Sequence, residues 1–430
     1  MSAPSELTEH FFRHQSAPLV ARLCRRFGAA ELVTIEDAVQ SAMLEAMLRW
    51  RKGPPERPAA WLHRVATNRV IDHLRRRARC ETVAEVEALE RAVADDPPSL
   101  DAEIDARGLD DDVLRLIFVV CHPALSPRAQ TMMALKHLCG FAVGEIARGL
   151  LMSPEAVKKQ LQRAAARLRA VEADFELPSD AELRERLDGV HRVLYLVFNE
   201  GYSCTRGEEV IRQDVCAEAA RLCHLLSGHR VGTAETRALL ALMMLHAARM
   251  PARVDGRGDT VLLEDQDRTR WDRSLIDAAA GWLCSAGPDG ASRPGRYQLE
   301  ACIAWLHGTA TDFAATPWAE IIGCYDALIR GFDAPAYRLN RAIAVAHLHG
   351  LDAARHELEA LSVTEHGLPP HGRSCANAWL HERAGDHEAA LRACREALAT
   401  DLAPHEWRLL DAQRSRLEAR IDARTAKREA

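Results

Sequence analysis

Residues 143–169 read VGEIARGLLMSPEAVKKQLQRAAARLR. The stretch predicts two helices joined by a tight turn, a helix-turn-helix. Ala147 is small enough to let the two helices cross closely. Ser153 is a suitable N-cap for the second helix, and Pro154 fits the first turn of that helix because its missing N–H costs nothing there.

The second of these helices has a polar and mostly basic outer face. Five residues are left to face outward once the apolar side is packed: Glu155, Lys158, Lys159, Gln162 and Arg163. Such side chains suit contacts with base edges in the major groove and with phosphates. A surface helix with a solvated basic face is the alternative, and for one basic helix alone it would be the better interpretation.

A second basic helix is predicted over residues 60–77, AWLHRVATNRVIDHLRRR. It follows a break at residues 53–58, where one glycine and three prolines prevent helix continuation. Aromatic and cationic groups on one helix suit a nucleic-acid strand whose bases are exposed for stacking. Trp61 fits either a core position or a stacking platform, and an ion pair with Arg75 or Arg76 is a sufficient explanation for Asp72.

A strongly acidic segment separates the two basic regions. Residues 81–112 carry twelve carboxylates and two arginines, and they include Asp95-Asp96-Pro97-Pro98-Ser99. High charge and proline leave little apolar surface to bury, so we interpret residues 80–109 as a linker. A helix over residues 113–120 then ends before His122-Pro123, and Ser126-Pro127 begins the next helix.

The composition predicts an all-α protein. The chain has 430 residues, a net charge of −6 and only 5% aromatic residues, and Val/Ile/Thr alternation is nearly absent. The length suggests two or three domains. Gly350 and Gly385 lie 35 positions apart in similar helix-turn contexts, close to the tetratricopeptide period. This spacing favours TPR-like repeats, with a generic helical bundle as the alternative. The expected limits are 1–79, 80–109, 110–175 and 180–430.

Twelve cysteines are scattered singly, without a Cys-x-x-Cys pair. They are expected to be small buried residues in a reducing compartment, with no metal and no cofactor. No leader segment and no apolar stretch long enough to cross a membrane occurs, so we expect a cytoplasmic protein with no membrane association. No phosphate-binding loop or assembled nucleophile is present, which argues against an enzyme.

The order of these motifs is similar to a known family. Residues 35–50, IEDAVQSAMLEAMLRW, together with residues 60–77 resemble region 2 of the extracytoplasmic-function (ECF) sigma factors, and residues 110–169 resemble region 4. The rest resembles the ECF subgroup with a long TPR-like C-terminal extension. Two motifs carry that likeness: Leu116-Ile117-Phe118 with Cys121-His122-Pro123-Ala124-Leu125, and Val197-Phe198-Asn199-Glu200-Gly201-Tyr202.

The resemblance implies partners and roles. The partners would be promoter DNA and core RNA polymerase, through its beta-prime clamp and beta subunit. The polymerase-binding residues would be Glu36, Asp37, Gln40 and Glu45; a solvated acidic face is the alternative for them. The −10 element would be read by Trp61, Asn68, Arg69, Asp72, Arg75 and Arg76, beside a base-capturing loop at 53–58. The −35 element would be read by Glu155, Lys158, Lys159, Gln162 and Arg163. The acidic linker resembles segments in the RNA-exit path, although a disordered tether fits equally well.

The extension from about residue 180 is expected to control the sigma core and to offer a surface for a protein or small ligand. A different class of function is a helix-turn-helix regulator or repeat scaffold that acts without polymerase. A remote third interpretation is an enzyme with its site in the extension. Its candidate acids would be Glu264, Asp265 and Asp267, although a helix N-terminus with compensating charges explains them more simply.

Overall fold

The computed structural model describes residues 3–50, 53–78, 106–150, 152–171, 175, 179–203, 211–287, 293–332, 334–361, 371–400 and 402–429. In these ranges the only β-structure is one isolated bridge between Val254 and Thr260. The expectation of an all-α fold is confirmed. Most of the predicted acidic linker, residues 80–109, lies outside the described residues.

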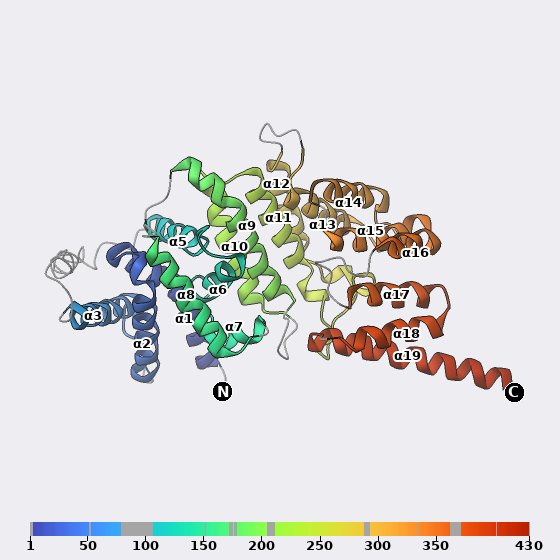
Figure 1. The fold of residues 1–430 in the computed structure, drawn as a ribbon, viewed down its shortest axis with the longest axis horizontal. Coiled ribbons are helices and arrows are strands. Elements are labelled where there is room, and N and C mark those ends of the chain that lie inside the picture. Colours follow the sequence, from blue (N-terminus) through green and yellow to red (C-terminus); the bar gives the residue numbers. More distant parts are fainter. Residues whose placement is uncertain are drawn as a thin grey trace. The chain divides into compact units, whose positions relative to one another are not determined.

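The chain divides into two compact units, which we describe separately. The first unit comprises Met1–Val197 and Ala217–Val231, and the second comprises Phe198–Cys216 and Gly232–Ala430. The helices of the first unit are α1 (Ala3–Phe27), α2 (Leu32–Arg49), α3 (Pro58–Ala78), α5 (Ala106–Val120), α6 (Pro127–His137), α7 (Val143–Gly149), α8 (Pro154–Ala170), and parts of α9 (Asp180–Tyr202) and α10 (Gln213–Gly228). They are coloured blue to green in Figure 1.

The helix-turn-helix forms where the sequence predicts it, as α7 and α8. The Ser153 hydroxyl accepts a hydrogen bond from the Ala156 N–H at 3.1 Å, which confirms the predicted N-cap. Ser126 caps α6 in the same way through the Ala129 N–H at 3.3 Å. Ala147 and Val157 are fully buried, so the small residue does allow the close crossing.

The second unit is a series of helical hairpins (Figure 1). Two of its turns contain the glycines that the sequence singles out. Gly350, at φ 93°, separates two helices, and so does Gly385, at φ 77°. Other residues are strained at such angles, which explains glycine in both turns. The helices are α11 (Ala234–Ala248), α12 (Arg273–Ser285), α13 (Arg296–Thr309), α14 (Trp318–Phe332), α15 (Pro335–His349), α16 (Leu351–Ala360), α17 (Gly372–Arg383), α18 (His387–Leu398) and α19 (Pro404–Glu429).

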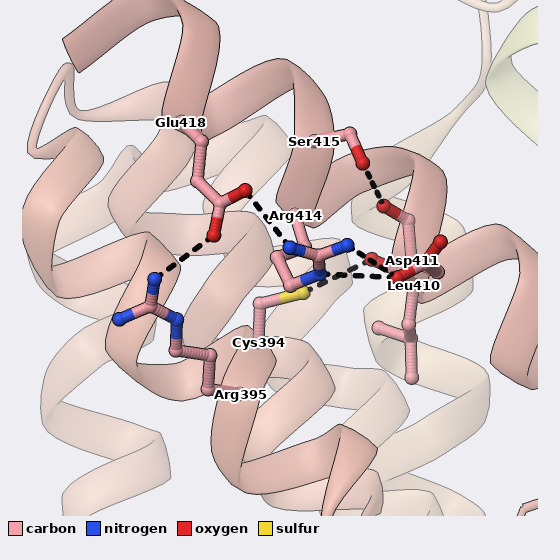
Figure 2. A network of polar contacts seen from close by, with 7 residues as sticks. All are labelled: Cys394, Arg395, Leu410, Asp411, Arg414, Ser415 and Glu418. Carbon is pink, nitrogen blue, oxygen red and sulfur yellow. Dashed lines mark hydrogen bonds and ion pairs between the residues drawn. The ribbon is translucent and has the colours of Figure 1, made fainter. Parts of the chain in front are cut away.

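The last hairpin, α18 with α19, is held by a small apolar core and a polar network (Figure 2). Arg414 bonds Asp411 at 2.7 Å and Glu418 at 2.8 Å, and Glu418 also accepts from Arg395 at 2.9 Å. These pairs are partly exposed to solvent and contribute little each. The buried alanines and Leu417 between the helices therefore supply most of the stability.

The cysteines are mostly buried, as expected. Cys24, Cys121, Cys139, Cys216, Cys223 and Cys394 are buried thiols. Cys284 is exposed on α12, which corrects the prediction at that position. Cys302, Cys324 and Cys375 are partly buried. Cys80 and Cys204 lie outside the described residues.

Gly201, in the predicted 197–202 motif, marks a close approach of two helices. A Cβ there would lie 2.8 Å from the Cys216 sulfur and 2.9 Å from the Arg212 carbonyl oxygen. Because that oxygen belongs to the backbone, we expect Gly201→Ala to lower the free energy of unfolding by about 1–3 kcal/mol. Urea unfolding of the full chain measures the change. The matched control is Gly281→Ala, since a Cβ on Gly281 meets nothing within 4 Å. Equal unfolding midpoints for the two variants would contradict the prediction.

Candidate nucleic-acid and polymerase interface

Helix α3 exposes the predicted −10 face. Leu62, Ala66, Val70 and Leu74 are buried, at the spacing of one helical side. The opposite side exposes Asn68, Arg69, Asp72, Arg75 and Arg76. The packing of α3 against α1 and α2 thus leaves a polar and cationic surface free for a ligand.

The structure bears on two further residues of this helix, Trp61 and Asp72. Trp61 is only half-exposed, and its ring meets the Trp50 ring edge to face at a centroid distance of 5.4 Å. That packing favours the core interpretation of Trp61 over the stacking platform. In the described part of the chain Asp72 has no ion pair within 4 Å, so the predicted pair with Arg75 or Arg76 does not form.

Glu45 connects α2 with the −10 face of α3. Its carboxylate accepts from Arg69 at 2.5 Å and from Arg49 at 2.8 Å. The hydrogen bond from Arg69 holds the pKa of Glu45 below its ordinary value. Glu45 therefore fixes the position of a predicted −10 residue, in addition to its predicted place on the polymerase-binding helix.

Helix α8 exposes all five predicted −35 residues. Its buried stripe is Val157, Ala164, Ala165 and Leu168. The outward face consists of Glu155, Lys158, Lys159, Gln162 and Arg163. The N-terminal turns of the second helix carry these residues, which is where a helix-turn-helix that enters the major groove would need them.

Helix α2 exposes an apolar face that the sequence analysis missed. Leu44 is 62% exposed, Met47 55% and Leu48 65%. Met47 and Leu48 follow Leu44 by three and four positions, so the three side chains share one side of the helix. The exposed Asp37 and Gln40 lie on the same side. Contiguous exposed apolar groups of this kind mark a binding surface. The signal was present in the sequence, since apolar residues fall on both sides of this helix.

Glu36, predicted to face the polymerase, contacts α6 instead. Its side chain is 13% exposed and forms an ion pair with Lys136, which is 7% exposed. His137 Nδ1 lies 3.5 Å from the same carboxylate. Burial lowers the pKa of His137 to about 3, so its imidazole is neutral at pH 7. Burial raises the pKa of Glu36, which Lys136 opposes.

Further contacts join the same two regions of the first unit. Arg25 on α1 pairs with Asp112 on α5 at 3.5 Å. Arg169, near the end of α8, donates two hydrogen bonds to the Ala30 carbonyl, at 3.2 and 3.1 Å. The predicted −10 and −35 helices therefore belong to one compact unit in this structure.

Buried neutral histidines predict acid sensitivity of the first unit. The pKa of His137 is lowered to about 3 and that of His191 to about 4, mainly by burial. The unfolded chain takes up protons at these positions below about pH 6.5, whereas the folded chain does not. We expect each histidine to cost roughly 2 kcal/mol of stability between pH 7 and pH 5.

Urea midpoints at pH 7 and pH 5 measure this loss, and His191→Leu should make it smaller. Glu36, whose raised pKa acts in the opposite direction, faces His137 and reduces the net effect. Stability that stays constant over this range would contradict the prediction.

The acids considered for an enzymatic site have structural partners. Glu264 bonds Trp379 and Arg383, and Asp267 caps a short 3-10 turn through the Thr269 N–H at 2.9 Å. Asp265 is exposed. The interpretation as compensated helix-terminal charges is therefore the better one for Glu264 and Asp267.

Comparisons with known proteins place these elements in families. Residues 13–80 match the model of Sigma-70 region 2, and residues 115–168 match that of Sigma-70, region 4. Residues 186–287 match a family of unknown function (DUF6596). The chain is also 41% identical over 340 residues to an uncharacterized protein of Rhizobium meliloti (strain 1021), covering 79% of each. No solved structure matches the chain.

Regions 2 and 4, in this order, define a sigma factor of the sigma-70 class with a role in promoter recognition. With the third domain behind region 4, the chain belongs to the ECF-like sigma factors that carry a C-terminal extension. The predicted family is confirmed. None of the described helices is long and apolar enough to cross a membrane.

Proposed function

We propose that the chain binds core RNA polymerase through α2 and directs it to promoters whose −10 element is read by α3 and whose −35 element is read by α8. The observation that carries the proposal is the exposed side of α2, where Leu44, Met47 and Leu48 stand next to Asp37 and Gln40. We call these five residues the docking face. Exposed apolar side chains beside polar ones fit docking on a partner protein.

The docking face revises the predicted polymerase-binding set. Asp37 and Gln40 remain in it, because both are exposed. Glu36 is engaged by Lys136, and Glu45 by Arg49 and Arg69. Apolar side chains that leave water on binding supply more affinity than solvated carboxylates, so we assign the anchoring role to the three apolar residues.

On the DNA, Arg75 and Arg76 are the strongest candidates for phosphate contacts beside a melted −10 element. Neither has an ion-pair partner among the described residues, and both project from the last turns of α3. On α8, Lys158, Lys159 and Arg163 are similarly exposed. The second unit and the residues that lead to it would modulate this activity from outside the DNA-reading helices.

Run-off transcription with purified core polymerase tests the proposal. The template is the chain's own upstream region, together with a promoter pool. We expect specific initiation by the full chain, and a loss of that initiation for Lys159→Ala/Arg163→Ala on the same templates. Duplex binding without initiation on any template would instead identify a helix-turn-helix regulator that acts without polymerase.

A further inference from the structure

The second unit contains a group of arginines without carboxylate partners. Arg249 follows α11, Arg253 follows a short 3-10 turn, and Arg268 begins another. Among the described residues none of the three forms an ion pair within 4 Å. We call these three residues the arginine cluster.

Two members of the arginine cluster share one indole ring. The guanidinium carbon of Arg268 lies 4.6 Å from the Trp271 ring centroid, and that of Arg249 lies 5.4 Å from it. Arg268 is 8% exposed and Trp271 is 3% exposed. Like charges this close repel each other, and burial adds a desolvation cost. Both effects lower the pKa of Arg268, burial more than Arg249.

The cluster is held in place by neutral groups. Arg268 Nη1 donates to the His307 carbonyl at 2.6 Å and to the Ala310 carbonyl at 2.9 Å. Arg249 Nε donates to Gln266 Oε1 at 3.4 Å. These bonds orient the guanidinium groups but leave their charge uncompensated. The exposed Asp312 carboxylate raises the pKa of Arg268 through its charge, but the two form no ion pair within 4 Å in the described structure.

Buried donors at the same place have no acceptor. Arg268 Nη2 and Trp271 Nε1 are both buried without a hydrogen-bond partner in the described structure. A buried donor without an acceptor costs about 1–3 kcal/mol. Two such donors, Arg268 Nη2 and Trp271 Nε1, beside two cations indicate a position built for an acceptor that the chain itself does not supply.

We infer that Arg249 and Arg268 of the arginine cluster, with Trp271, bind the oxyanion of a small molecule, a carboxylate or a phosphate. An oxyanion accepts several hydrogen bonds at once and compensates both guanidinium charges. It would accept from Arg268 Nη2 and from Trp271 Nε1, with Arg249 at its side. The inference does not depend on polymerase binding, and it gives the extension of this sigma factor a ligand class.

Isothermal titration of the full chain with inorganic phosphate and with acetate tests the inference, against chloride at equal ionic strength. We expect saturable binding of at least one anion. The anion with the lower dissociation constant shows whether the site prefers a phosphate or a carboxylate. Trp271→Phe keeps the ring and removes the N–H, and Arg249→Gln removes one charge. We expect each to weaken binding about tenfold or more. Arg330→Gln, which removes an exposed arginine on α14, should leave binding unchanged.

Circular dichroism confirms that each variant is folded before titration. Saturable binding that is lost in Trp271→Phe and kept in Arg330→Gln supports the site. No saturable binding of either anion to the folded wild-type chain would overturn it, and so would equal weakening by all three variants. The titration measures anion binding and not transcription. Failure of this inference can therefore be distinguished from failure of the proposed sigma-factor function.

Discussion

Replacing Leu44 and Leu48 with lysine is expected to reduce the affinity of the chain for core RNA polymerase by roughly 100-fold or more. The two side chains are 62% and 65% exposed on α2, so the substitutions remove no core packing. Each substitution would remove an apolar anchor and add a charge that must be desolvated in the complex. Affinity for core polymerase, measured by fluorescence anisotropy or biolayer interferometry, gives the change directly.

The matched control is Leu348→Lys, which places the same substitution at an apolar residue that is 43% exposed on α15. It should leave polymerase affinity unchanged. Binding of the Leu44/Leu48 variant to a −35 duplex should also persist, because α8 is not altered. If the variant binds polymerase as tightly as wild type, the docking face is assigned to the wrong surface of the first unit.

Local patterns were sufficient to predict the helices and the sides of α3 and α8 that are exposed. Ser153 and Pro154 define the start of α8 within a few residues of sequence, and the apolar spacing then determines which side faces outward. The glycine turns at 350 and 385 were predictable for the same reason, since a positive φ restricts the residue type at one position.

Contacts between distant segments could not be predicted in this way. Glu36 has the same sequence context as Asp37, yet only Glu36 meets Lys136 from α6. The arginine cluster is a second case. Arg249, Arg268 and Trp271 lie in or beside short turns without periodicity, and tertiary packing alone brings them together. The predicted domain limits near residues 110 and 180 remain predictions.

The contact between Glu36 and Lys136 places α6 and α8 against the region 2 helices. Helix α2 touches both α3 and α8, so the two helices with the predicted −10 and −35 faces pack on one helix that is only about 27 Å long. Promoter elements centred near −10 and −35 are about 25 base pairs apart, roughly 85 Å along B-form DNA. If α3 and α8 contact the two elements as proposed, we expect regions 2 and 4 to separate before both elements are bound.

We expect Lys136→Met to favour that separation. The variant leaves the buried Glu36 carboxylate without its counter-ion and with only the Gln40 amide as a donor at 2.9 Å, and breaking a buried pair in this way costs roughly 3–5 kcal/mol. That cost is enough to shift the equilibrium toward the separated arrangement by about 100-fold or more. Promoter-complex formation at limiting sigma concentration should then rise, because a larger fraction of the chain is competent to bind. Electrophoretic mobility shifts with core polymerase measure the rise.

The double variant Glu36→Gln/Lys136→Met separates this effect from general damage. Removing both charges leaves no buried ion, and replacing a whole buried pair is often neutral or stabilising for the packed state. The double variant should therefore return promoter-complex formation to the wild-type level or below it. Hydrogen exchange in α6 should be faster in the single variant and normal in the double variant. If both variants bind promoters equally well, the pair does not control the separation of regions 2 and 4.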